Sequence, residues 1–211
     1  MKFMTKALIG LAGVGGLAWG VQELRLAGAA SETPTRMTCK ELGEKGAAGN
    51  AHVVLTDFLL TGDVVYEHKR KSSDTEKWTK VWVAAVPTDG PYALALRDAG
   101  EAGPSVPPPR PVHVIAVFTD TKNEHELAAM AAKPELDGMV VNLISSLGHE
   151  EEKLLQGTYG DVSKAQIFEV GRKPTKSLYA FSAIGVGAAV ALGVLASFFR
   201  RRKPAEAVVT A

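Results

Sequence analysis

Five histidines are the side chains of this sequence best suited to proton transfer or metal binding: His52, His68, His113, His125 and His149. The dipeptide His125-Glu126 resembles the start of the zinc-protease motif H-E-x-x-H, in which two imidazoles lie one helical turn apart. Residue 129 is alanine, so the second imidazole is missing. His149 precedes three glutamates, but consecutive helical residues point in different directions and form a poor metal cage. We interpret that run as the solvated, acidic start of a helix.

Other catalytic motifs are also missing from the sequence. It contains neither the G-x-S-x-G nucleophile elbow nor the phosphate-binding pattern G-x-x-x-x-G-K-[ST]. The run "GVGGLA" resembles the start of a dinucleotide fingerprint, but that motif works only between a strand and a helix. The acids Asp57, Asp63 and Glu67 fall in predicted strands and turns, where acids are common, and we do not assign them as an acid–base pair. We therefore assign no catalytic, cofactor-binding or metal-binding residue, and an enzyme is the less favoured interpretation.

The charge balance limits the kinds of partner. The 24 Lys and Arg residues and the 23 Asp and Glu residues leave a net charge of +1, which gives no general basic field for nucleic acid. With 46% apolar and 22% charged residues, the middle of the chain can bury a core. Cys39 is the single cysteine, so no intrachain disulfide is possible. We interpret Cys39 as an ordinary small residue near a helix start.

The C-terminal part of the sequence has the pattern of a membrane span. The run from Ser177 to Phe199 carries no charge, and about 20 residues at ~1.5 Å rise each cross a ~30 Å hydrocarbon core. Four cations then follow in a row and favour the cytoplasmic side: Arg200, Arg201, Arg202 and Lys203. We predict a transmembrane helix over 177–199 and a short basic cytoplasmic tail over 200–211.

The N-terminal 30 residues fit two interpretations. Lys2 and Lys6 precede an apolar run from Ala7 to Val21, which is short for a span and suits a signal-peptide core. Ala27-Gly28-Ala29 fits a cleavage site, whereas the charges at Glu23 and Arg25 argue against cleavage. Local features leave a cleaved signal peptide and a retained transmembrane segment equally open. In both cases the middle of the protein is exported.

Small residues recur every four positions in both apolar segments. One row contains Gly185, Ala189 and Gly193, and a second contains Ala183, Gly187 and Ala191. In the N-terminal segment, Gly16 and Gly20 share this spacing. Small residues at such spacing let membrane helices approach closely. We predict that the two segments pack on each other or on copies of themselves through six residues: Gly16, Gly20, Gly185, Gly187, Ala189 and Gly193.

The first half of the middle region reads as a linker, a helix and three strands. Residues 31–36 are polar and are predicted as a linker, and Thr38 to Glu41 has capping-box spacing for a helix that stops near Gly46. The runs "NAHVVLTDF" and "DVVYEHK" predict a hairpin that turns at Thr61-Gly62. "WTKVWVAAVP" predicts a third strand with Trp78 and Trp82 on one side, and Pro87 ends it.

The second half begins with a proline-rich loop over 99–111. "VHVIAVFTD" then predicts a strand buried on both faces, and a helix capped at Thr121 follows it. Apolar residues between Leu136 and Leu147 have helical spacing, although "GMVVNLI" also suits a strand. "HEEEKLLQ" predicts another helical turn or two, and "KAQIFEV" predicts a final strand. Only Gly171 to Lys176 separate that strand from the apolar C-terminal run.

Part of this region resembles a known family. Glu67-His68-Lys69, followed by Trp78 and by Val86-Pro87, is similar to part of the domain between the two membrane spans of GIDE-type mitochondrial E3 ubiquitin ligases. The resemblance implies a domain beside the membrane on its non-cytosolic side, a retained N-terminal span and a role in interaction. The ligases carry a zinc-binding RING finger after the last span, whereas residues 200–211 contain no Cys or His. We therefore expect no ubiquitin-ligase activity.

Together these patterns predict an α+β fold: a β-rich, membrane-adjacent domain over 31–176 with a few short helices, flanked by transmembrane helices. The expected function is a membrane-anchored interaction or scaffold protein that presents this domain outside the cytoplasm. Its expected partners are the membrane and a protein or helix-mediated oligomer, without nucleic acid. The alternatives are an exported hydrolase or metal-dependent enzyme that uses His113, His125 or His149, and a small subunit of a membrane complex.

Overall fold

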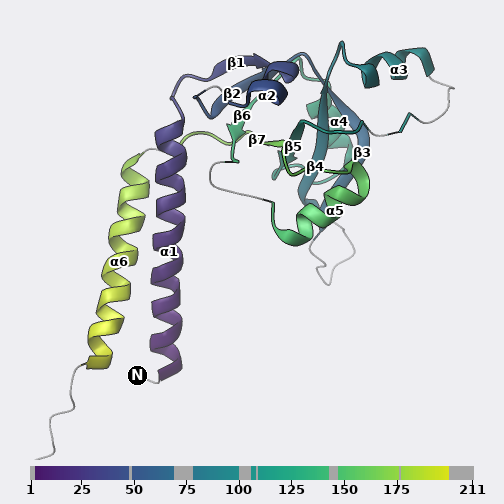
Figure 1. The fold of residues 1–211 in the computed structure, drawn as a ribbon. Helices are drawn as coiled ribbons and strands as arrows, with labels where there is room; N and C mark the ends of the chain where they lie inside the picture. The colour runs from purple at the N-terminus through teal and green to yellow at the C-terminus, as the bar shows by residue number, and fades with distance from the viewer. Residues whose placement is uncertain are drawn as a thin grey trace, which may run out of the picture. The chain divides into compact units, whose positions relative to one another are not determined.

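The computed structural model describes residues 3–47, 49–68, 78–99, 106–107, 109–142, 147–175 and 177–199 (Figure 1). The chain divides into two compact units. One unit combines Met1–Leu24 with Thr175–Ala211, and the other is Arg25–Pro174.

The first unit is an antiparallel pair of helices, α1 (Phe3–Ala29) as far as Leu24 and α6 (Ser177–Phe199) (Figure 1). The last five residues of α1, from Arg25 to Ala29, belong to the second unit. Both are long and apolar enough to cross a membrane, by length and composition. At one end of the pair, Lys6 Nζ donates to the carbonyl oxygen of Ser197 at 3.3 Å. At the other end, Thr175 Oγ1 donates to the carboxylate of Glu23 at 2.7 Å. Polar contacts therefore join the two segments at both ends of an apolar pair.

The described residues of the second unit form a seven-stranded mixed sheet, and the predicted α+β class is confirmed. The strand order is β1 (Thr35–Thr38), β2 (His52–Thr56), β6 (Glu135–Val140), β7 (Gln166–Val170), β5 (Val114–Phe118), β4 (Trp78–Pro87) and β3 (Phe58–His68). The pairs β1–β2 and β5–β7 are parallel, and the other neighbours are antiparallel. All five residues of β5 are buried, as its continuous apolar run predicts.

The sheet has a core on each face. Alternate residues of β4 divide between them: Val83 packs in the first core and Trp82 in the second. The first core receives Leu42 from α2 (Cys39–Lys45) and Leu127 from α4 (Glu124–Ala131). The second core receives Leu155 from α5 (His149–Tyr159) and also a residue from the last turn of α1. A further helix, α3 (Pro91–Ala99), follows β4.

The predicted hairpin at Thr61-Gly62 is wrong. These two residues lie inside β3, and the chain changes direction earlier, at Asp57, whose φ is 49°. β3 pairs with β4, whereas β2 pairs with β1 and β6. The glycine marks a shift of register between Leu60 and Val64, because a residue without a side chain is easily accommodated in a strand irregularity.

The helical interpretation of the segment that begins at Leu136 is also wrong for its described part, because residues 135–140 form β6. Apolar residues at short intervals suit both structures, and here pairing with two neighbouring strands decides the outcome. Gly138 shows why the strand fits: a Cβ added there would collide with the carbonyl oxygen of Glu169 on β7. Leu143 and Ile144 lie outside the described residues.

One of the two predicted helix caps is confirmed. The capping box of α2 is confirmed: Thr38 Oγ1 accepts from Glu41 N, and the Glu41 carboxylate accepts from Thr38 N, both at 3.1 Å. The cap of α4 is Asn123 instead of Thr121.

Trp78 and Trp82 were expected on one side, but Trp78 packs on the first core and Trp82 lies in the second. A register shift between Glu67 and His68 on the paired strand accounts for the change of face.

Candidate functional site

A cavity of about 650 Å³ lies within the second unit, where the end of β4 and the segment before β5 meet α2 and α3. This volume is in the range of small-molecule binding sites. Among the described residues, the largest class in its lining is proline: Pro87, Pro91, Pro107, Pro109 and Pro111. Four segments that are distant in the sequence therefore build one concave, mainly apolar surface.

Several residues that line the cavity are small. Gly43 of α2 faces the chain before β5, and a Cβ added at Gly43 would lie 2.8 Å from the Cβ of His113. Ala85 and Ala95 contribute only methyl groups to the lining. Larger side chains at these positions would fill part of the cavity or force α2 away from His113.

The charges that line the cavity are balanced. Lys40 and Arg110 oppose Glu44 and Asp89 among the described lining residues. Arg110 is already engaged, because its guanidinium donates to the carbonyl oxygen of Thr158 at 3.3 Å. The described lining residues therefore carry equal numbers of positive and negative side chains and have no net charge with which to attract an ion.

Cys39 forms part of the cavity wall and is 2% exposed. Burial raises the pKa of its thiol to about 12. Because the thiolate is the nucleophilic form, a thiol with such a pKa is inert near neutral pH. Cys39 therefore acts as an apolar wall residue, in agreement with its interpretation as an ordinary small residue.

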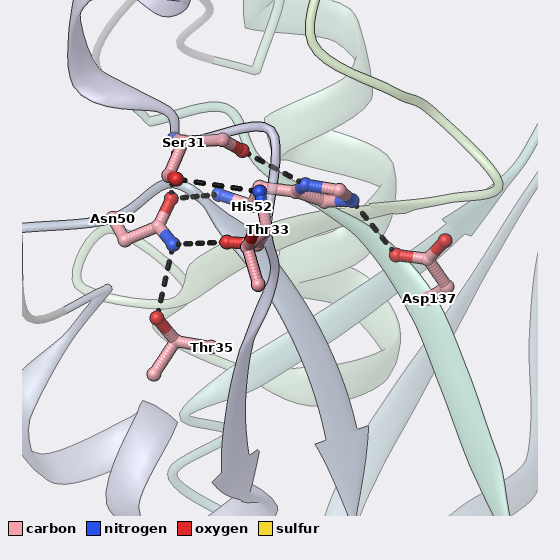
Figure 2. Close-up of polar contacts among 6 residues, drawn as sticks. All are labelled: Ser31, Thr33, Thr35, Asn50, His52 and Asp137. Carbon is pink, nitrogen blue, oxygen red and sulfur yellow. Dashed lines mark hydrogen bonds and ion pairs between the residues drawn. The ribbon is translucent and has the colours of Figure 1, made fainter.

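A polar cluster lies at the other side of the sheet, around His52 of β2 (Figure 2). Nδ1 of the imidazole lies 3.0 Å from the carbonyl oxygen of Ser31, and Nε2 lies 3.0 Å from Asp137 Oδ1. Asn50 Oδ1 accepts from Ser31 N at 2.9 Å and from His52 N at 3.0 Å. Its Nδ2 donates to the carbonyl oxygen of Thr33 at 3.1 Å and to Thr35 Oγ1 at 2.9 Å. These contacts fix the segment between α1 and β1. The prediction of a linker over 31–36 is wrong for Thr35 and Arg36, which belong to β1.

The arrangement of Ser31, His52 and Asp137 differs from a catalytic triad. In a triad the imidazole contacts the serine hydroxyl, whose proton it removes. Here the imidazole contacts the Ser31 carbonyl, and the hydroxyl accepts a hydrogen bond from Thr33 N at 3.3 Å. The cluster therefore attaches a chain segment to the sheet. We call it the polar clasp, and it consists of Ser31, Thr33, Thr35, Asn50, His52 and Asp137.

The other histidines lie on separate elements. His113 precedes β5 and lines the cavity, His125 is on α4 and His149 begins α5. The helices α4 and α5 contribute to opposite cores, so His125 and His149 do not share a site. Within the described ranges, no group of three or more His, Cys, Asp or Glu residues is placed to hold a metal ion.

Of the residues predicted for helix packing, Gly16 and Gly20 lie on α1, and the four on α6 divide between its contact face and its outer face. A Cβ added at Gly187 would lie 2.8 Å from the Gly13 carbonyl oxygen, and one added at Gly20 would lie 2.7 Å from Ile184 Cγ1. Gly16 is also on the contact side, since its added Cβ would be 3.9 Å from Gly187 Cα. Gly185 and Gly193 have no atom within 4 Å of such a Cβ, and Ala189 is exposed.

Gly13 was not predicted as a packing residue, although it lies three residues before Gly16 in a row of small residues. The cavity had no such signal, because its walls come from segments far apart in the sequence. The topology residues Arg200, Arg201, Arg202 and Lys203 lie outside the described part of the chain.

Comparison of the chain with protein-family models, with curated proteins and with solved structures found no match. The resemblance to GIDE-type ligases therefore stays a prediction from the sequence.

Proposed function

We propose that the chain is a membrane-anchored interaction protein that holds a partner at the membrane surface through its α+β domain. The observation that carries the anchored part of this proposal is Leu26, which lies in α1 and is 1% exposed in the second core of the domain. The same helix supplies the apolar N-terminal segment. An anchor that contributes a core residue belongs to the mature fold.

The main chain supports the same conclusion. The carbonyl oxygen of Ala29 accepts a hydrogen bond from Ala51 N at 2.8 Å, next to β2. Cleavage after Ala27-Gly28-Ala29 would remove Leu26 and break the chain at this contact. Loss of a fully buried leucine side chain costs about 2–5 kcal/mol. The retained span, one of the two N-terminal interpretations, is therefore part of the proposal.

The proposal of a second membrane span, α6, rests on its close packing against α1. Their backbones approach closely at Gly13 and Gly187, which is typical of membrane helices that pack through small residues. Lys2 and Lys6 before the first helix, and the four cations after Phe199, favour the cytoplasmic side for both ends. In this topology the domain lies outside the cytoplasm, and residues 171–176 give it a short C-terminal tether.

Interaction is preferred to catalysis because the candidate catalytic groups are committed elsewhere. Both ring nitrogens of His52 face protein oxygens, and the thiol of Cys39 is held neutral by burial. The alternative hydrolase or metal enzyme needs His113, His125 or His149 to converge with acids. His125 and His149 lie on separate helices, away from the cavity lining that contains His113, Glu44 and Asp89. The described residues, this lining included, contain no group of three or more His, Cys, Asp or Glu placed to hold a metal ion.

Reporter fusions test the orientation of the chain in the membrane, and the mass of the purified protein tests whether the N-terminal segment is cleaved. Alkaline phosphatase inserted after Glu76 should be active, whereas the same enzyme fused after Ala211 should be inactive. The purified protein should keep its full mass of 22.3 kDa. A mature N-terminus near residue 30 would overturn the retained anchor, and an active fusion after Ala211 would overturn the orientation.

The interaction itself is tested by crosslinking in intact membranes, followed by purification in mild detergent. The same protein partner, or a second copy of the chain, should be recovered in repeated experiments. Recovery of no reproducible partner contradicts the proposal. A partner that stays bound only while α1 and α6 are present would instead favour a small subunit of a membrane complex.

A further inference from the structure

We propose that the cavity between α2, α3 and the end of β4 binds a small, uncharged molecule with a flat, rigid, apolar body such as an aromatic ring system. This inference goes beyond the interaction function and does not depend on the membrane topology. Its first support is size, because about 650 Å³ exceeds what one protein side chain fills and is typical of a small-molecule site.

The second support is the shape and rigidity of the lining. Pro87, Pro91 and Pro109 line the cavity, and the ring of each proline fixes its backbone angle φ covalently. Proline rings and aromatic rings are complementary surfaces, as the docking of proline-rich peptides on aromatic grooves illustrates. A rigid lining also loses little conformational entropy when a ligand binds.

The third support is charge. The described lining combines Lys40 and Arg110 with Glu44 and Asp89, so neither an anion nor a cation gains from a net field. The Cys39 thiol remains neutral, since burial raises its pKa to about 12. An ion in this cavity would lose hydration, and because lining side chains of both signs are present, no net field would offset that cost. Tyr92 and His113 line the cavity and supply hydrogen-bonding groups for orientation.

The test uses the full chain in lipid nanodiscs, with ¹³C-labelled valine methyl groups observed by NMR. Val86, Val106 and Val114 line the cavity, whereas Val14 and Val186 lie in the apolar helices and report on probe dissolved in lipid. The probes share one ring system: indole is neutral, tryptamine is a cation and indole-3-acetate is an anion. Indole should shift the cavity methyl signals saturably, and the charged probes should bind at least about tenfold more weakly.

Two substitutions on one helix provide the matched control. Ala95 is exposed and lines the cavity, so Ala95→Trp should fill it and abolish the saturable shifts. Leu96 is 43% exposed and is outside the cavity lining, so Leu96→Trp should bind indole like the original chain. Absence of saturable shifts, or indole binding that Ala95→Trp leaves unchanged, overturns the proposal. Tighter binding of either charged probe overturns the assignment of a neutral ligand.

Discussion

The hydroxyl of Tyr159 lies 3.3 Å from the amide nitrogen of Ala84 and donates its own proton to the carbonyl oxygen of Asp63. The register between β3 and β4 leaves Ala84, like Thr79, without a partner on β3, because Leu60 pairs with Ala85 and Val64 with Val83. The tyrosine therefore replaces a missing ladder contact with its side chain. Burial raises the pKa of the Tyr159 hydroxyl, so it remains a donor near neutral pH.

Replacing this hydroxyl should weaken the domain without changing its shape. Tyr159→Phe leaves the buried Ala84 N–H unpaired, which costs about 1–3 kcal/mol in free energy of unfolding. Urea denaturation of the full chain in detergent measures the loss. Tyr179→Phe, on a tyrosine that is 64% exposed, is the control and should have no such effect. Equal stability of both variants would show that the bridge contributes nothing.

The last turn of α1 should behave as core. Leu26→Ala removes a side chain that is 1% exposed and should lower the free energy of unfolding by about 2–5 kcal/mol. Leu8→Ala removes a leucine of the same helix that is 64% exposed, and the domain should be unaffected. Thermal unfolding, monitored by near-ultraviolet circular dichroism, measures the stability of both variants. If Leu26→Ala matches Leu8→Ala, the anchor is not part of the core.

The polar clasp should control the order of the segment after α1. Asn50→Ala removes the acceptor of Ser31 N and the donor to Thr35 Oγ1, so amide hydrogens of residues 31–38 should exchange faster. A stability loss of about 1–3 kcal/mol should accompany this change. Asn123→Ala removes the cap of α4 and should accelerate exchange only around that helix. Unchanged exchange at 31–38 in Asn50→Ala would contradict the role of the clasp.

Acid should weaken the attachment of α5 through Glu151. Burial raises the pKa of this carboxyl, but hydrogen bonds from Lys80 and from Gly148 N lower it, and the net pKa lies below its usual 4.5. The folded state therefore binds the proton less tightly, and the stability from Glu151 is present above pH 4.5 and lost as pH falls through the folded pKa. Glu151→Gln should make unfolding less dependent on pH below 4.5. Glu150→Gln, on an exposed neighbour, should retain the original dependence.

The helix contact should depend on Gly187 and not on Gly185. Leucine at Gly187 would collide with the backbone of α1, whereas leucine at Gly185 meets open space. With Cys39 replaced by alanine, cysteines introduced at Lys6 and Ser197 should crosslink in the Gly185→Leu background and lose most of that crosslink in Gly187→Leu. Equal crosslinking in both backgrounds would contradict the observed packing face.

The sequence predicts best where one local signal dominates. The apolar run of β5 and the capping box of α2 each contain their own evidence, and both are confirmed. The strand β6 was misjudged because its spacing fits two structures and only its neighbours decide. Helix α3 was missed, since an apolar but short run before a proline-rich loop carries little periodic signal.

The site was harder to predict than the fold for a related reason. Spacing by four identifies rows of small residues on α6 but does not say which row meets α1, and the row of Gly185 faces away. The cavity is assembled from pieces of the chain between residues 39 and 114, and no single piece is unusual. Contacts between distant segments, such as His52 with Ser31 and Asp137, depend on strand pairing and leave no local signal in the sequence.

The position of β7 has a consequence for biosynthesis. This strand is the last of the sheet in the chain but lies in its middle, between β6 and β5, and it ends seven residues before α6 begins. Until residue 170 has left the ribosome, β1, β2 and β6 are separate from β3, β4 and β5, and two inner strands have open edges. The sheet therefore closes only when nearly the whole chain has been made, and a truncation before β7 leaves two half-sheets prone to aggregation.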